Sequence, residues 1–379
     1  MTARLTGLPM CVSILLLAMA SGGGQAAVTD EFDAGTAEWY ALQIGVQEAT
    51  VQRLEGISTT NDPQHVKSGA GALQFDYTSD KESLKVVGRF APEMPKAMSL
   101  RFWAKADRDI PLGLLVSETD KSRYGFMLFL SKNTWQRVEV NLEDLVLAPG
   151  SVDENDRLDA DALEIIAVGD ATPQLAAQAA LDPASAPYLQ VELGPGTLWI
   201  DQFEVSELPV APLHPRLDTP RGTAAILDSF GSGMLMWMLI MDPEYSFVPG
   251  DGDTCLELAY TPRPMIGMVY PSVVGLVDAE TDVLTLKARC DRATMLMVGV
   301  QEADGSAYTA RASIVPKEDW ETIEFGLDQF TPAPQAPDAN FRLDPAQIAG
   351  LMVLAGPATP GDTEARKLWL DDVAFLTLR

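Results

Sequence analysis

Apolar and polar side chains alternate along short stretches of this chain. The segments LQFDY (73–77), LRFWAKA (100–106) and VEV (138–140) place an apolar residue at every second position. A period of two puts successive side chains on opposite faces of an extended strand, so the pattern predicts half-buried β-strands. Because Gly, Pro and Asp separate these short strands, they favour an antiparallel sandwich. Helix-like patterns are short and lie near 161–166 and 345–348.

The chain contains a long internal repeat. The segment LRFWAKADRDIPLGLLVSETDKSRY (100–124) aligns without a gap over LTLKARCDRATMLMVGVQEADGSAY (284–308). Further along, TWQRVEVNLEDL matches DWETIEFGLDQF, and LWIDQFEV (198–205) matches LWLDDVAF (368–375). A repeat of this length indicates two copies of one domain.

The repeat sets the expected domain boundaries. We expect a first domain at 28–208, a proline-rich linker at 209–220 and a second domain at 221–379. The first copy is longer because it contains an insertion, ATPQLAAQAALDPASA, which predicts a surface loop with at most one helical turn. In a chain of 379 residues, each copy is long enough to bury its own core.

The N-terminal residues have the pattern of a secretory signal peptide. Arg4 precedes an apolar run, and small residues then lead to a cleavage site near Ala27, which gives a signal peptide at 1–27. The run is shorter than the roughly 20 apolar residues that span a bilayer, so we expect export without membrane insertion. The destination would be periplasmic, cell-surface or extracellular. A formal charge of -27 repels phosphate, which makes nucleic acid a poor partner.

The reactive residues argue against an enzyme. There are two histidines, His65 in a turn-rich segment and His214 in the linker, and the chain has no G-x-S-x-G motif. Among 54 acidic residues, no pair of carboxylates is marked as a catalytic pair. Cys255 and Cys290 remain after processing, and the sequence leaves open whether they form a disulfide. We therefore expect a noncatalytic protein.

Four segments occur in an order that is typical of one family: SGAGALQFDY, LRFWAKA, TWQRVEVNLEDL and LWIDQFEV. In this order the chain resembles the galactose-binding-like jelly rolls. These include carbohydrate-binding modules of glycoside hydrolases and the related complex I intermediate-associated proteins. The resemblance covers nearly all of both halves. It implies an all-β fold of two tandem antiparallel jelly-roll β-sandwiches, and a role in binding carbohydrate.

The resemblance also implies a structural calcium. In these jelly rolls, an aspartate of the last strand commonly holds calcium together with an acid near the first strand and backbone carbonyls at a glycine turn. The matching positions are Asp201 and Asp371 for the last strand, Glu31 or Asp33 and Asp228 for the first, and Asp251 and Asp253 for the glycine turn of the second copy. The alternative is that these aspartates are solvated or hydrogen-bonded.

Comparison of the two copies separates shared tryptophans from one that is not shared. A tryptophan present in both copies predicts a core residue, because both copies must fold. The shared pairs are Trp39 with Trp237, Trp135 with Trp320, and Trp199 with Trp369. Trp103 instead faces Lys287 and alternates with apolar positions, so we expect it to point outward from its sheet.

Trp103, Met127 and Phe129 are the expected ligand-binding platform. By alternation all three point away from the core, where they would form an apolar strip. In the modules that this chain resembles, one sheet of the domain forms a concave face where exposed aromatic residues stack on sugar rings, so the resemblance implies such a face in the first domain. The polar donors expected nearby are Arg101, Lys105 and Arg123. The alternative is that the strip is buried against the second domain or the inserted loop. Two functions therefore stay open: recognition of a carbohydrate, and assembly with another envelope protein through the same surface.

Overall fold

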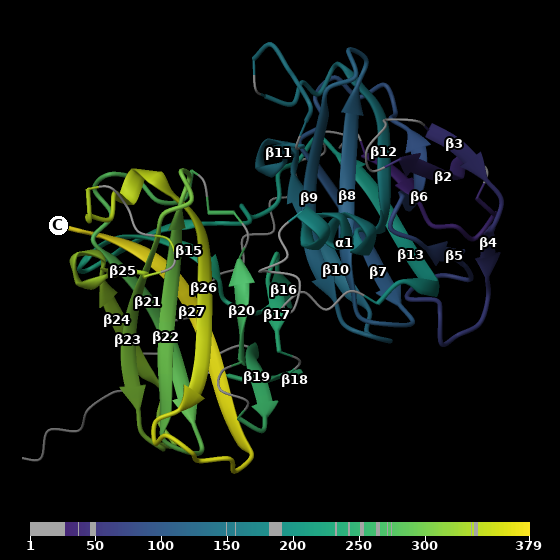
Figure 1. Cartoon of the computed structure of the whole chain (residues 1–379). Helices are drawn as coiled ribbons and strands as arrows, with labels where there is room; N and C mark the ends of the chain where they lie inside the picture. Colours follow the sequence, from purple (N-terminus) through teal and green to yellow (C-terminus); the bar gives the residue numbers. More distant parts are fainter. Residues whose placement is uncertain are drawn as a thin grey trace, which may run out of the picture.

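The computed structural model describes residues 27–379 except 37, 46–50, 149, 156, 182–191, 232, 242, 251–253, 263–265, 271, 274, 335 and 337–339. Within these residues the chain forms two β domains, each built from two antiparallel sheets (Figure 1). The expected all-β fold, with two tandem antiparallel β-sandwiches, is confirmed. The proposed signal peptide lies outside the described residues except for Ala27, where β1 begins.

The first domain consists of sheets I and II. Sheet I contains, in spatial order, β10 (Gln136–Asn141), β7 (Ser99–Ala106), β13 (Gly194–Ser206), β5 (Ala72–Ser79) and β4 (Ile57–Thr60), with β1 (Ala27–Asp30) paired to β13. Sheet II contains β11 (Val146–Leu147), β9 (Arg123–Leu130), β8 (Ile110–Glu118), β12 (Leu163–Asp170), β6 (Ser83–Phe90), β2 (Trp39–Gly45) and β3 (Val51–Leu54).

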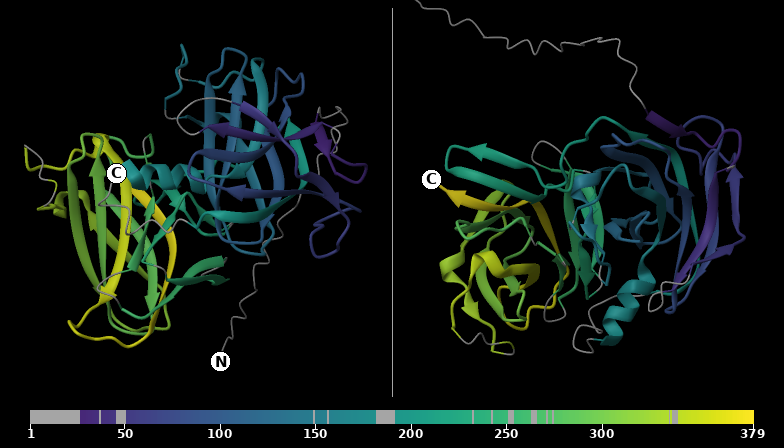
Figure 2. Two further views of the ribbon diagram at one scale, coloured as in Figure 1. Left: turned by 45° about the vertical axis from the view of Figure 1, so that its right-hand side comes forward. Right: turned by 90° about the horizontal axis from the view of Figure 1, so that it is seen from above.

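The second domain repeats this arrangement in sheets III and IV. Sheet III contains β14 (Arg216–Thr219), β15 (Gly222–Asp228), β27 (Arg366–Leu378), β19 (Thr254–Tyr260) and β18 (Glu244–Pro249), and β21 (Val283–Cys290) joins β27 to β24 (Glu321–Gly326). Sheet IV contains β17 (Met238–Ile240), β20 (Ile266–Tyr270), β26 (Ile348–Pro357), β22 (Thr294–Glu302), β23 (Ala307–Ile314) and β25 (Thr331–Pro332). Figure 2 shows the β14–β15 hairpin beside the C-terminal strand β27. Part of the segment expected as a linker therefore forms a strand of the second domain.

The alternation of apolar residues fills the space between the two sheets of each domain. Leu100, Phe102 and Ala104 on β7 are buried in the first core, and Phe102 stacks on Phe203 of β13 with 5.8 Å between ring centroids. Trp237 occupies the matching core of the second domain, as Trp39 does in the first. Burial of these apolar faces is the main source of stability for such a sandwich.

The few helices differ in part from the sequence patterns. The insertion contains a ten-residue helix, α1 (Thr172–Leu181), where at most one turn was expected. The helix-like pattern at 161–166 is wrong, because the chain enters strand β12 at Leu163. The short helix near 345 is confirmed as the 3-10 turn η3 (Pro345–Gln347); the others are η1 (Leu142–Asp144) and η2 (Leu327–Gln329).

A strand of the second copy joins the two domains. β16 (Met234–Leu235) pairs with β9 of sheet II, with Met234 opposite Phe129. Nearby, the hydroxyl of Tyr245 donates to Asp109 Oδ1 across the junction at 3.0 Å. These contacts fix the position of the second domain against the edge of sheet II.

Two other features bear on the sequence-based expectations. Cys255 and Cys290 are both buried free thiols. Among the described residues, no helix has the length and apolar character needed to cross a membrane.

Candidate functional site

The six residues expected to bind a ligand lie on two different sheets. Trp103, Arg101 and Lys105 are on β7 in sheet I, whereas Met127, Phe129 and Arg123 are on β9 in sheet II. Both sets point away from the core, as alternation predicted. Outward faces of opposite sheets lie on opposite sides of a sandwich, so the prediction of one combined platform is wrong.

Trp103 is covered on one ring face. It is half-buried, and the Lys67 ammonium lies 4.0 Å from its ring centroid. The segment that carries Lys67 is held against sheet I, because Lys105 Nζ donates to the Gln64 carbonyl at 2.8 Å. This cation–π contact occupies the ring face that a sugar would need.

Trp199 is buried, as expected for a shared tryptophan, but it does not lie between the two sheets. On β13 it alternates with the core residues Leu198 and Ile200, so its ring lies on the outer face of sheet I. It is nevertheless buried, because His65 stacks on it with 4.0 Å between centroids and 4° between planes. Its counterpart Trp369 likewise lies on an outer face, beneath the Arg289 guanidinium at 4.6 Å.

Arg101 is neutralised by carboxylates on its own sheet. Its guanidinium lies 3.3 Å from Glu204 on β13 and 3.8 Å from Glu139 on β10. Lys105 donates to a carbonyl and Lys67 lies over Trp103. Like Arg101, these two cations therefore stabilise local structure.

The four aspartates named for calcium accept backbone N–H groups. Asp201 Oδ2 accepts from Lys67 and Ser68 at 2.8 and 2.9 Å, and burial raises the pKa of this carboxyl. Asp33 Oδ1 accepts the amides of residues 70 and 71 in the glycine turn. Both oxygens of Asp228 also accept N–H groups, from residues 230 and 235.

Asp201 and Asp371 share one further role. Each accepts the N–H of the residue that follows it, at 2.8 and 2.9 Å. That residue has a positive φ in both copies, 49° at Gln202 and 45° at Asp372, where the strand pairing shifts register. These contacts fit the hydrogen-bonded alternative, since N–H groups point at oxygens that a cation would need. Calcium at these positions stays a prediction, and the Asp251 to Asp253 turn lies outside the described residues.

One other group of carboxylates comes together in the described part of the chain. One oxygen each from Glu118, Asp120 and Asp153 lie within 4.8 Å of one another. Glu118 accepts the Asp159 N–H at 2.5 Å, and in the second copy Glu302 accepts the Asp344 N–H at 2.6 Å. Because the same loop contact recurs in both copies, it gives Glu118 a structural role.

Met127 and Phe129 lie at the domain junction. The Phe129 ring packs edge-on against Tyr245 of the second domain, with 5.7 Å between centroids. Met127 lines a cavity together with Leu175 of α1. These two residues therefore match the alternative expectation, in which the strip is buried against the second domain or the inserted loop.

The rest of the outer face of sheet II carries a row of small residues. This row runs across the strands from Tyr40 through Gly88, Ala167 and Leu115 to Gly125. A Cβ added at Gly88 would lie 3.2 Å from the Ile166 carbonyl and 3.2 Å from a Leu42 methyl. Gly88 and Ala167 are therefore buried among apolar side chains of this face, whereas Gly125 is half-buried.

Two aromatic rings lie where this row begins. Phe90 is 63% exposed, and its ring lies edge-on to Tyr40 with 6.1 Å between centroids. The Arg53 guanidinium lies 4.0 Å over the Tyr40 ring. The row that begins at Phe90 crosses Ile165 and Ser117 and ends at Arg123.

Tyr40 and Phe90 were missed as binding residues in the sequence. Tyr40 follows the shared Trp39, and its counterpart in the second copy is Met238, which follows Trp237. The comparison that singled out Trp103 would therefore have singled out Tyr40 as well. Phe90 carries no such signal, since an exposed phenylalanine at a strand end is common.

Known proteins resemble this chain only distantly. No family model and no curated protein matches it. Among solved structures, it is similar to a family 11 carbohydrate-binding module from Clostridium thermocellum, with 19% identity over 41% of this chain and 94% of that one and a TM-score of 0.34. It is also similar to the CBM22-1-CBM22-2 tandem domain from Paenibacillus barcinonensis, with 12% identity over 94% and 99% of the two chains and a TM-score of 0.33. An agarase matches 42% of this chain at 12% identity with a TM-score of 0.33, through 25% of its own length. The first two of these solved structures are carbohydrate-binding modules, and the third is an agarase. TM-scores this low support no conclusion about function, which therefore rests on the geometry of the site.

Proposed function

We propose that this chain is an exported, noncatalytic protein that binds carbohydrate across the outer face of sheet II. The observation that carries the proposal is the exposed ring of Phe90, which lies beside Tyr40, where the row of small residues Gly88, Ala167 and Gly125 begins.

The chemistry of this face suits a sugar ring. A pyranose has an apolar face of C–H groups, which stacks on an aromatic ring, and a rim of hydroxyls, which need hydrogen-bond partners. Phe90 supplies the exposed ring, and Tyr40 packs edge-on against it. Arg53, which lies over the Tyr40 ring, and Arg123 supply donors at the two ends of this face. One stacked ring and a few polar contacts support weak binding at each site.

An envelope protein is the second candidate partner. It is favoured by the apolar residues that share this face, where Leu42, Leu84 and Ile165 pack around a small cluster on the outer side of sheet II. A partially exposed apolar patch often marks a protein interface. The two candidates differ in whether the isolated protein is retained by a glycan.

The test is affinity electrophoresis of the mature protein, residues 28–379, through gels that contain a panel of neutral and acidic polysaccharides. We expect retardation by at least one glycan, about a tenfold loss of affinity in Phe90→Ala, which removes the stacking ring, and a smaller loss in Tyr40→Ala, which removes the ring packed edge-on against Phe90. Phe341→Ala is the matched control, because Phe341 is a phenylalanine of the second domain that is 71% exposed.

The outcomes separate the candidate surfaces. Trp103→Ala should leave binding unchanged, because Lys67 covers that ring. If Trp103→Ala abolishes binding while the Phe90 variant does not, the site lies on sheet I and the proposal is wrong. If no glycan retards the protein, the protein-partner candidate replaces it.

A further inference from the structure

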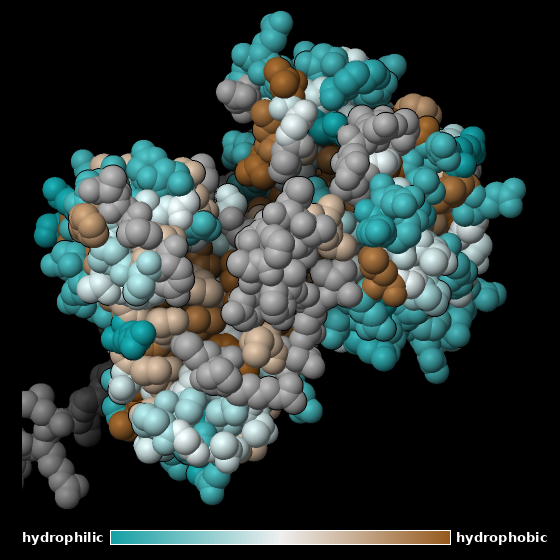
Figure 3. Space-filling view, in the orientation of Figure 1, coloured by the Kyte–Doolittle hydropathy of each residue, from teal (hydrophilic) through white to brown (hydrophobic). Residues whose placement is uncertain are grey.

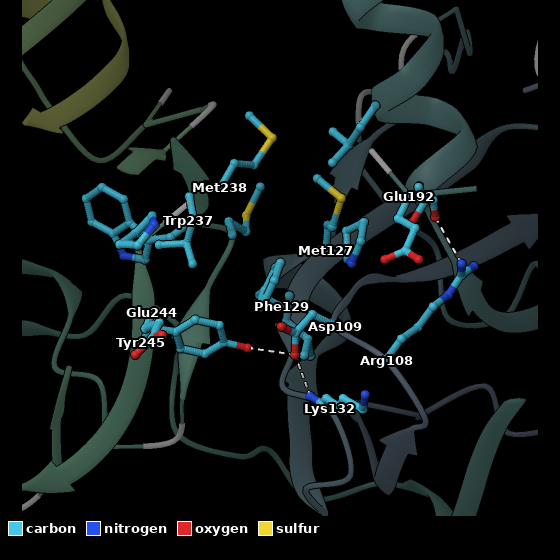
Figure 4. A pocket seen from close by; sticks show the side chains of 17 residues that line it. Arg108, Asp109, Met127, Phe129, Lys132, Glu192, Trp237, Met238, Glu244 and Tyr245 are labelled. Atoms are coloured by element: carbon cyan, nitrogen blue, oxygen red, sulfur yellow. Dashed lines mark hydrogen bonds between the residues drawn. The ribbon is translucent and has the colours of Figure 1, made fainter. Parts of the chain in front are cut away.

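A cavity of about 630 Å3 lies between the two domains. Its volume falls in the range of roughly 300–1,000 Å3 that is typical of small-molecule sites. Figure 3 shows apolar side chains in the recess where the domains meet. Figure 4 shows Met127 and Phe129 on the wall formed by the first domain, opposite Met238 and Trp237 of the second.

Direct contacts across the junction hold the two walls together. β16 of the second copy pairs with β9, and the Tyr245 ring packs on Phe129. Tyr245 also donates to Asp109, whose Oδ1 in turn accepts the Lys132 N–H at 2.6 Å. The cavity is therefore bounded by strand pairing and packed rings, which a preformed site requires.

The charges that line the cavity favour a cation. Arg108 is neutralised by Asp170, at 2.8 Å from its guanidinium. Among the other described lining residues, three carboxylates, Asp109, Glu192 and Glu244, face one ammonium group, that of Lys132. The whole chain adds a formal charge of -27, so the field at this site attracts cations and repels anions.

The uncharged lining complements a cation that has an apolar body. Aromatic faces attract cations through the negative charge of the ring face, and Phe129 and Tyr245, which are both half-buried, line the space. Three methionines, at 127, 236 and 238, add flexible thioethers that adapt to an irregular apolar ligand. A sugar has too little apolar surface to contact most of these methionine side chains.

We infer that the cavity between the domains binds a small organic cation with an aromatic or aliphatic body. This site is separate from Tyr40 and Phe90, so it does not depend on the function proposed above.

A series of ligands that differ only in their head group tests the inference. Phenethylammonium, phenethyl alcohol and phenylacetate present the same ring with a positive, neutral and negative group at pH 7. We expect isothermal titration calorimetry of the mature protein to rank them in that order, with the ammonium about tenfold tighter than the alcohol. Raising the salt concentration should reduce the difference in affinity between phenethylammonium and phenethyl alcohol.

A matched pair of double variants locates the site. Glu192→Gln with Glu244→Gln removes one carboxylate from each wall and should weaken phenethylammonium about fivefold to tenfold, with no change for the alcohol. Glu93→Gln with Glu280→Gln removes one exposed carboxylate from each domain away from the cavity and should change neither affinity. Equal affinities across the series, no heat with phenethylammonium at millimolar concentration, or an equal loss in the control variant would each overturn the inference.

Discussion

Asp228 provides a test of how a buried carboxyl affects the stability of the second domain. Its side chain is 3% exposed, and its two oxygens accept the N–H groups of Phe230 at 2.7 Å and Leu235 at 2.9 Å. Burial raises the pKa of Asp228 to about 7; the two N–H groups oppose this shift, and the charge of Asp371 adds to it. Because Leu235 belongs to β16, the same carboxyl also anchors the strand that joins the domains.

The sign and size of the effect follow from the two pKa values. An aspartate in an unfolded chain has a pKa of about 3.9, so the folded state binds this proton more tightly. The resulting stabilisation is complete below pH ~4 and is lost as the pH rises through about 7. A difference of about three pH units corresponds to about 4 kcal/mol, with a slope of about 1.4 kcal/mol per pH unit inside that window.

Asp228→Asn isolates this contribution. Asparagine has nearly the shape of the protonated side chain but does not titrate, so other ionisable groups cancel when the variant is compared with the wild type. We expect urea denaturation to show the free energy of unfolding of the variant rising, relative to that of the wild type, by about 1.4 kcal/mol per pH unit from pH 4 to 7.

Asp328→Asn, which removes an exposed carboxylate of the same domain, controls for the change in net charge. A difference between wild type and Asp228→Asn that stays constant from pH 4 to 7 would show that the carboxyl does not change its protonation state in this range, and would refute the reasoning.

Three further substitutions test other contacts. Arg89→Met removes a buried guanidinium that pairs with Asp30, and should cost about 3 kcal/mol in urea denaturation; a cost below 1 kcal/mol would contradict a structural role for the pair. Gly169→Ala would place a Cβ 2.4 Å from the Lys85 carbonyl, so we expect a loss of about 2 kcal/mol by the same assay, and an unchanged midpoint would count against it. Tyr245→Phe removes the hydrogen bond across the junction and should lower the free energy of unfolding by about 1 kcal/mol. Scanning calorimetry should then separate the unfolding transitions of the two domains more clearly, and thermograms identical to those of the wild type would contradict this expectation.

The sequence predicted the strands and the duplication because both depend on local or repeated patterns. The alternation that places Leu100 and Phe102 inward is a property of any extended chain with one buried face. The same rule, applied at 198–200, places Trp199 outward between two core residues. Presence in both copies predicts that this tryptophan is buried, but it does not distinguish the space between the sheets from an outer face covered by His65.

The binding face could not be predicted because it depends on contacts between distant parts of the chain. Alternation tells which side of a strand a residue occupies, but it does not tell which sheet the strand joins. Trp103 and Met127 therefore share the outward direction while lying on opposite sides of the sandwich. The segment that puts Lys67 over Trp103 is likewise held by Asp201, which is 134 residues away in the chain.

Differences between the two copies carry information about the junction as well as about ligands. Met127 and Phe129 correspond to Arg311 and Ser313 in the second copy, and both of these are exposed. The first copy has a domain after it, and its β9 edge accepts β16 and the Tyr245 ring. No such partner covers Arg311 and Ser313 among the described residues, so polar side chains are stable there. A residue that turns apolar in only one copy of a repeat can thus mark the surface on which its neighbour packs, and a ligand site is better sought where the apolar residue, like Phe90, still faces solvent.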